Sequence, residues 1–585
     1  MNRLLAPALI AILALPIAAC GDKKAKSATE NKAMLELLEY APADTPYMFA
    51  ATEAMPDAVT DKMQPMLDEL KPIMTEMFSN ISQMVAQSDE GAAMAPKFDN
   101  IGKAMSTLME KDSAERFGFG DTVVGILYGN GLLPVYRGVL KEPGKFGPAV
   151  DALFAEMDVE ITSKSAAGID YRNVAMGESV NMIVAQIDGV AVVTLAPAPF
   201  DEDDIALLLG KTKPAKALQA STVKAMTDKY NYLPQGFGWI DIQQIAATFL
   251  DEPTGINAAL LDMIGEDRPQ LDAVCVTEMK ALSGIAPRMT IGYTDISTDS
   301  MTLNPVFELR SDIAAAMIPV AGKVPGLTTD SDAMMKFGLG LNLGGMREYI
   351  ESYVGKVVDN PYECAELDEL NASARQMVAS LNQPVPPMVD NFQGFFLELN
   401  SMDGIDLGQP QIPDNLDVNI LLAMDNINGL IQFGQMMVPQ LASIDIEPNG
   451  KAVELPPALT GPVPQAVFAA MTDNALGLSI GPEAQSRAGA IAASDDVSSN
   501  TLIAVSMDMG AYADLMESLE GQMASEMSDF DPDEGDAAQT VEAAKKQMEL
   551  SARLQRAYAD TFEREVANIN ITENGLEMPS TLEFR

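Results

Sequence analysis

The stretch IVAQIDGVAVVTLAP, residues 183–197, decides the fold because its pattern recurs as FAAMTDNALGLSIGP, residues 468–482. Each copy has two apolar runs separated by a turn signal, Asp-Gly in the first copy and Asp-Asn in the second. A proline closes the second run of both copies. The chain is therefore predicted to contain an internal duplication built on β-hairpins.

Four further pairs of segments occur in the same order in the two parts of the chain, on either side of the hairpin copies. They are MFAATEA from Met48 with FGLGLNL from Phe337, VYRGVLKE from Val135 with VNILLAMD from Val418, FGWIDIQQIA from Phe237 with AVSMDMGAYA from Ala504, and LNPVFELR ending at Arg310 with MPSTLEFR ending at Arg585. The third pair keeps Asp241 and Asp508 at a strand-to-helix turn. Two long units indicate a pair of similar lobes, since a solenoid needs shorter and more numerous repeats.

Strands that alternate with long helices, together with several hairpin turns, predict an α+β protein. We expect two homologous tandem lobes, each a mainly antiparallel β-sheet with helices packed on one face. The predicted divisions are a signal peptide at 1–19, a lipidated cysteine with a flexible tether at 20–33, a first lobe at 34–312 and a second lobe at 313–585. The lobes are expected to join near residues 311–332.

The chain begins with Arg3, an apolar run over residues 4–16, and then Ile-Ala-Ala before Cys20. This is the pattern of a secretory signal and is too short to span a membrane. It resembles the lipobox of bacterial lipoproteins, in which the cysteine is lipidated and becomes the new N-terminus. The resemblance implies a membrane anchor at Cys20, and an ordinary cleaved signal with a chance cysteine is the alternative.

The tether after Cys20 is locally basic, with lysines at 23, 24, 26 and 32, and this favours contact with anionic head groups. A solvated linker without specific contacts is the alternative. Asp22 lies second after the cysteine, so the inner and outer membranes are not distinguished by it. We expect a periplasm-facing protein of the cell envelope, on the outer membrane rather than the inner.

The formal net charge is −46, so nucleic-acid binding is not expected, since phosphate contact needs a basic surface. Methionine is frequent, with 38 residues. Five of them recur at helical spacing early in the first lobe and are candidates for a soft apolar groove, with core packing as the alternative: Met63, Met66, Met74, Met77 and Met84.

Cys275 and Cys364 are the remaining cysteines, one in each predicted lobe. Exported proteins occupy an oxidising compartment, which favours a disulfide between the lobes over two separate thiols. One weak metal signal lies in SDFDPDEGD, where Asp529, Asp531, Asp533 and Asp536 begin like a calcium loop. The glycine is one place late and the final glutamate is missing, so a solvated acidic loop is the alternative. No other cofactor is expected.

Catalytic motifs are weak because the chain contains no histidine. Ser479 lies in a G-x-S-x-G match, but the usual triad needs a histidine to accept the serine proton. Ser221 and Lys224 fit S-x-x-K without its companion motifs. The acidic run at residues 201–204 is expected to cap a helix. We therefore predict a protein that is not an enzyme.

Three features resemble an uncharacterised class of bacterial exported proteins that carry a repeated module of unknown function. They are the segment Pro-Ala-Asp-Thr-Pro at residues 42–46, the strand at residues 134–140, and Tyr171 before the hairpin. The resemblance implies an extracytoplasmic α+β repeat protein and assigns no catalytic residue.

The preferred function is a membrane-anchored periplasmic lipoprotein that acts as a non-catalytic binding or scaffolding protein of the cell envelope. The alternative is a carrier or chaperone for lipids or other apolar ligands, through a methionine-lined groove. The expected partners are the membrane, reached through Cys20, and an envelope protein or an apolar ligand.

Overall fold

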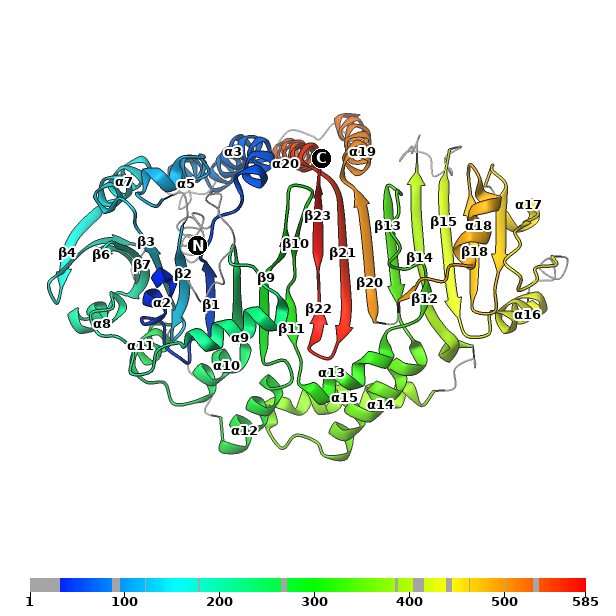
Figure 1. Cartoon of the computed structure of the whole chain (residues 1–585), viewed down its shortest axis with the longest axis horizontal. Helices are drawn as coiled ribbons and strands as arrows, with labels where there is room; N and C mark the ends of the chain where they lie inside the picture. Colours follow the sequence, from blue (N-terminus) through cyan, green and yellow to red (C-terminus); the bar gives the residue numbers. More distant parts are fainter. Residues whose placement is uncertain are drawn as a thin grey trace.

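A computed structural model describes residues 32–86, 95–120, 123–176, 179–264, 271–383, 388–402, 415–437, 444–461, 463–498, 500–529 and 536–585. The strands stand side by side along the long axis of the molecule, and helices lie at both ends of the strands (Figure 1). Across the described residues, 21 strands form one antiparallel sheet. The fold class is α+β, as the sequence predicts.

The N-terminal half of the sheet contains β1 to β11. From its outer edge inward the strands run β4, β5, β6, β7, β3, β2, β1, β8 and β9, and β9 then pairs with both β10 and β11. Their bounds are β1 Tyr47–Ala51, β2 Gly125–Asn130, β3 Leu133–Val139, β4 Ile161–Ala166, β5 Ile169–Ala175, β6 Val180–Ile187, β7 Val190–Pro197, β8 Phe237–Asp241, β9 Arg288–Ile296, β10 Ser300–Leu303 and β11 Val306–Glu308.

The C-terminal half repeats this order with β16, β17, β18, β15, β14, β13, β20 and β21, and β21 then pairs with both β22 and β23. The bounds are β13 Met335–Gly340, β14 Phe392–Ser401, β15 Asp417–Met424, β16 Val453–Glu454, β17 Val467–Met471, β18 Ala475–Ile480, β20 Thr501–Asp508, β21 Phe562–Thr572, β22 Gly575–Glu577 and β23 Ser580–Phe584. Two short strands, β12 Val324–Pro325 and β19 Val497–Ser498, form a separate pair.

The two halves meet through their equivalent edges, because β10 pairs with β23 and β11 pairs with β22. This is the arrangement of a two-fold interface formed within one chain. The sequence predicts one sheet in each lobe, whereas the structure joins both into a single sheet. Pairing the two edges satisfies backbone N–H and C=O groups that isolated edge strands would leave open.

The strand registers correct the alignment of the two repeat copies by one residue. Val135 lies opposite Thr194, and in the other half Asn419 lies opposite Ser479. The hairpin match, which equates Thr194 with Ser479, therefore equates Val135 with Asn419, one residue beyond the Val418 chosen from sequence. A one-residue difference matters because it moves a side chain to the other face of the sheet.

Turn and cap chemistry follows the sequence at the first hairpin turn and at three aspartates that precede helices. Asp188 and Gly189 adopt positive φ, 49° and 81°, as a type I′ hairpin requires. Asp241 Oδ1 accepts a hydrogen bond from the N–H of Gln244 at 2.9 Å, and Asp508 Oδ1 accepts one from Ala511 at 2.8 Å. Asp201 forms a capping box at the start of α8, which confirms that the acidic run caps a helix.

Helices pack on both faces of the sheet in the N-terminal half, whereas one face was expected. Val135 and Val192 point to a core with α2, α8 and α9, and Tyr136 and Val193 point to a core with α5, α6 and α7. The helices of this half are α2 Lys32–Leu38, α3 Asp57–Ala86, α5 Ala95–Leu108, α6 Ser113–Arg116, α7 Pro143–Glu156, α8 Glu202–Leu208, α9 Ala220–Tyr230, α10 Ile242–Leu250, α11 Gly255–Ile264 and α12 Ala273–Ser283.

In the C-terminal half, the expected junction at residues 311–332 forms α13 and β12 as part of the packed structure. The helices are α13 Ser311–Met317, η4 Ile318–Val320, α14 Leu343–Asp359, η5 Ala365–Leu367, α15 Asp368–Leu381, η6 Val389–Asn391, α16 Ile427–Met437, α17 Pro457–Thr460, α18 Ala484–Ala492, α19 Met509–Asp529 and α20 Asp536–Thr561. Among the described helices, none is both long enough and apolar enough to cross a membrane.

Candidate functional site: the open face of the sheet

One face of the C-terminal half carries two continuous rows of apolar side chains. Each row crosses six hydrogen-bonded strands, β18, β15, β14, β13, β20 and β21. The first row is Leu478, Ile420, Leu397, Phe337, Val505 and Ala567, and the second is Leu476, Leu422, Phe395, Leu339, Ile503 and Ile569. We call the face with these rows the open face, and the opposite one the covered face.

Burial separates the two faces. Phe337 in the middle of the first row is 39% exposed, and the other side chains of the two rows are half-buried. On the covered face of the same strands, Phe396 and Leu421 are fully buried. Strands lie about 4.8 Å apart, so a row of six is about 24 Å long. The hydrocarbon core of one bilayer leaflet is roughly 15 Å thick, so each row is longer than an acyl chain that spans one leaflet.

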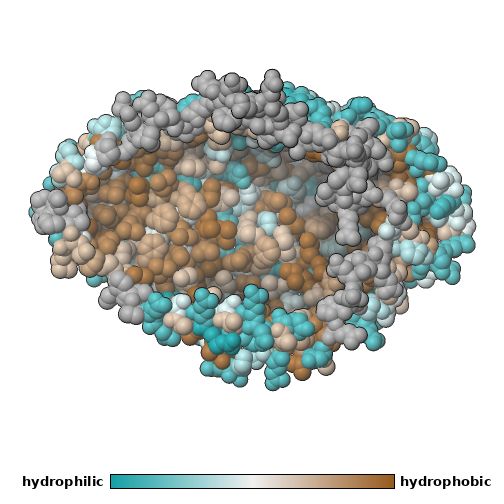
Figure 2. Space-filling model, turned by 180° about the vertical axis from the view of Figure 1, so that it is seen from behind, coloured by the Kyte–Doolittle hydropathy of each residue, from teal (hydrophilic) through white to brown (hydrophobic). Residues whose placement is uncertain are grey.

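Helices form walls at both ends of these strands, on either side of the two rows. At one end Leu515 of α19 packs with Leu399 and Val418, which extend the open face. At the other end Ile427 of α16 shares a cluster with Leu422 and Leu476. Figure 2, seen from behind, shows hydrophobic residues gathered in a broad hollow between hydrophilic rims. The open face is therefore the floor of an apolar groove.

The apolar surface continues into the N-terminal half. Tyr47, Ile240, Met289, Phe307 and Leu576 lie opposite one another on successive strands, and all five are half-buried. The Tyr47 hydroxyl donates to the Leu132 carbonyl at 3.0 Å, and burial raises its pKa. The row crosses from one half of the sheet to the other through β11 and β22, so both halves contribute to one surface.

The covered face carries a buried polar chain under the first row. Ser479 Oγ donates to Asn419 Oδ1 at 2.9 Å, and Asn419 Nδ2 donates to Glu398 Oε2 at 3.1 Å. Glu398 Oε1 pairs with Lys336 Nζ at 3.3 Å, and Lys336 is only 3% exposed. Lys336 also donates to the carbonyls of Gly326 and Thr329, at 2.7 and 2.9 Å. These bonds hold the segment around β12 against the sheet.

Close packing explains which face is covered. A Cβ at Gly338 would lie 2.3 Å from Leu327, which belongs to the segment held by Lys336. A Cβ at Gly477 would lie 2.7 Å from the Ala488 carbonyl of α18. The small residues therefore face the covering elements, and the large apolar residues that alternate with them point to the open face.

A separate cavity of about 740 Å³ lies between α3, α19 and α20. Its lining is charged, and Arg556 donates to Glu517 at 2.7 Å and to Asp514 at 2.6 Å. Burial, then the carboxylates of Glu549 and Glu517, raise the pKa of Glu520. A lining of charged side chains makes this cavity a poor match for an apolar ligand.

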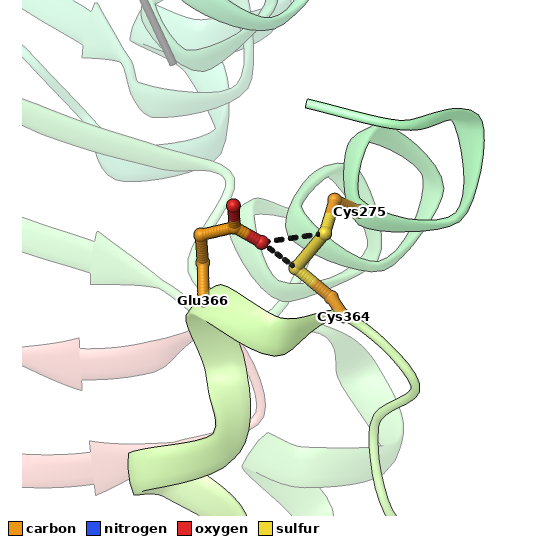
Figure 3. A group of neighbouring side chains, drawn as sticks. All are labelled: Cys275, Cys364 and Glu366. Carbon is orange, nitrogen blue, oxygen red and sulfur yellow. Dashed lines mark hydrogen bonds between the residues drawn. A yellow bond between two sulfur atoms is a disulfide. The ribbon is translucent and has the colours of Figure 1, made fainter. Parts of the chain in front are cut away.

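A disulfide joins Cys275 of α12 to Cys364 before η5, as predicted. Glu366 Oε2 lies 2.8 Å from Cys275 Sγ and 3.1 Å from Cys364 Sγ (Figure 3). These three residues have the spacing of metal ligands. Metal binding requires thiolates, however, and both sulfurs are used by the bond. The group therefore acts as a covalent link between elements of the two halves.

The methionines proposed for a groove take different positions. Met66 is 5% exposed, and it packs with Met63 in a cluster that includes Ala557 of α20. These two side chains join the halves, while Met74 and Met77 are half-buried on α3. Met84 is in α3, and its side chain lies outside those described. The apolar groove is formed by the open face instead, where leucine, isoleucine and phenylalanine dominate.

The structure describes the residues of the two catalytic motifs, but it does not describe the lipidation site or the side chains of the acidic segment. Ser479 is fully buried in β18, and Lys224 is paired with Asp228 at 2.8 Å. Cys20 lies outside the described residues. So do the side chains of the acidic segment proposed for calcium: Asp529, Asp531, Asp533 and Asp536.

The open face was not identified from sequence. Its signal is the pattern of β13, Lys-Phe-Gly-Leu-Gly, and of β18, Leu-Gly-Leu-Ser-Ile, in which large apolar residues alternate with small or polar ones. Such alternation is usually assigned with the apolar side toward the core. No family model, curated protein or solved structure matches this chain.

Proposed function

We propose that this protein is a periplasmic envelope lipoprotein, anchored through Cys20, that binds the acyl chains of a lipid on the open face of its sheet and has no catalytic activity of its own. The observation that carries the proposal is the set of accessible apolar rows in the hollow of Figure 2. Large exposed apolar patches rimmed by polar residues are typical of binding sites.

Two features favour an acyl ligand over a protein scaffold. The rows are long and are lined by aliphatic and aromatic carbon, and they contain no charged residue. Each methylene that leaves water contributes about 0.8 kcal/mol, so a long chain gains more from such a floor than a short one. A protein partner would also need polar groups in the floor to orient it.

Palmitate is a suitable probe, with the mature chain carrying Cys20→Ser so that its own anchor is absent. Phe337→Glu places a carboxylate in the middle of the first row, and we expect palmitate affinity to fall at least about tenfold, or 1.4 kcal/mol. Phe249→Glu on α10 is the matched control, since Phe249 is 50% exposed and lies off the open face. Equal effects of both variants, or no palmitate binding by the parent chain, would contradict the proposal.

A further inference from the structure

Helix α16 is an apolar element at the end of the groove. Its sequence, INGLIQFGQMM, contains no charged residue, although the chain as a whole has a net charge of −46. On its inner side Ile427 is fully buried, and Leu430 and Ile431 pack against the cluster that contains Leu422 and Leu476 of the open face. The helix is thus continuous with the second apolar row.

The outer side of α16 is exposed. Met436 is 75% exposed and Met437 69%, the two highest values among the large apolar side chains in the described residues, and Phe433 is 40% exposed. Residues at positions i, i+3 and i+4 lie on one face of a helix, so these three side chains form a single patch. Scattered apolar residues are ordinary on a surface, whereas three that lie together on one helix face form a candidate interaction site.

The chemistry of the patch fits the interface of a lipid bilayer. Methionine and phenylalanine enter the boundary between head groups and acyl chains, and methionine adapts to irregular surroundings. Eleven residues make a helix of about 16 Å, which is too short to span a bilayer and long enough to lie in its interface. A helix without lysine or arginine does not select anionic lipids, and one without acids is not repelled by them.

We propose that α16 is the membrane-contact element of this protein and the portal through which acyl chains pass between a bilayer and the open face. The inference rests on the proposed function, because it gives the open face its lipid. Contact at Phe433, Met436 and Met437 places the end of the second row at the membrane surface. An acyl chain can then move from the bilayer to Leu422 and Leu476 along apolar side chains, without crossing water.

The test uses the chain with Cys20→Ser and vesicles of phosphatidylcholine, which carry no net charge. The variant is Met436→Glu with Met437→Glu, and the matched control is Met377→Glu with Met523→Glu, at side chains that are 45% and 44% exposed on α15 and α19. We expect co-flotation with vesicles to fall at least tenfold in the variant and to match the parent in the control. Binding by the parent should be insensitive to salt, since the patch is uncharged.

A second readout separates the portal from the binding site. Transfer of a fluorescent phospholipid from vesicles to the protein should slow at least tenfold in the variant, whereas its affinity for dissolved palmitate should stay unchanged. Equal flotation of variant and parent, or unchanged transfer, overturns the inference. Loss of palmitate affinity in the variant also overturns it, because α16 would then be part of the binding site itself.

The two proposals fail differently. A parent chain that floats through α16 and binds no palmitate would remove the open-face function and leave the membrane contact standing. A parent chain that does not float, and forms a dimer that the variant abolishes, would make the patch a contact between copies and overturn the membrane assignment.

Discussion

Removing the disulfide tests how the two halves are held together. Cys275 and Cys364 are separated by 89 residues, and the bond closes that loop. In the chain-entropy model a loop of this size contributes about 4.6 kcal/mol to the free energy of unfolding at 25 °C. Both cysteines are buried, 2% and 0% exposed, so replacement by alanine adds a small loss of packing. We therefore expect Cys275→Ala with Cys364→Ala to lower the free energy of unfolding by about 4 to 5 kcal/mol.

Urea unfolding with two probes measures this loss. Trp239 is the one tryptophan of the chain and is buried in the N-terminal half, so its fluorescence reports on that half, while far-ultraviolet circular dichroism reports on both. The parent chain in dithiothreitol is the control, and it should unfold at the same urea concentration as the double variant. A loss below about 1 kcal/mol would refute the reasoning, because the bond would then add little constraint to the unfolded chain.

Three further substitutions test individual features. Lys336→Met removes a cation whose side chain is 4% exposed from its pair with Glu398, whose side chain is 12% exposed, and should cost about 3 to 5 kcal/mol in the free energy of unfolding. Lys229→Met at a more exposed pair should cost less than about 1 kcal/mol. Asp201→Ala removes the capping box and should cost about 1 kcal/mol, measured by thermal unfolding. Glu520→Gln should stabilise the protein at neutral pH, because the folded state raises the pKa of Glu520 and so loses stability as the pH rises above the ordinary glutamate value. This advantage should disappear in acid, where the parent residue is also neutral, and equal stabilisation at both pH values would contradict it.

The sequence predicts the positions of the hairpin strands and their repetition, because both are determined by the local pattern of apolar residues and by the residues at the turns. The Asp-Gly turn at residue 188 and the caps at Asp201, Asp241 and Asp508 form as expected. The disulfide was predicted from an expected oxidising compartment and from the cysteine count, and it forms. The joining of two sheets into one was not predicted, since the pairing of β10 with β23 links residues that lie far apart in the chain.

The orientation of the C-terminal half of the sheet could not be read from its strands. In β13, alternation allows either Lys336 and Gly338 or Phe337 and Leu339 to face the core. Apolar burial favours the second choice, and the structure takes the first. It can do so because Lys336 finds Glu398 and two carbonyls, and because Gly338 leaves room for Leu327. Those partners come from distant segments, which a local pattern does not specify.

The measurement that tests the central claim most directly is native mass spectrometry of the chain from residue 20 with Cys20→Ser, exported to the periplasm of an expression host and purified without detergent. Lipid binding on the open face predicts an adduct of lipid mass that leaves on denaturation, and a reduced adduct in the Phe337→Glu variant but not in Phe249→Glu. A bare mass for the parent chain, together with no uptake of added phospholipid, would contradict the account.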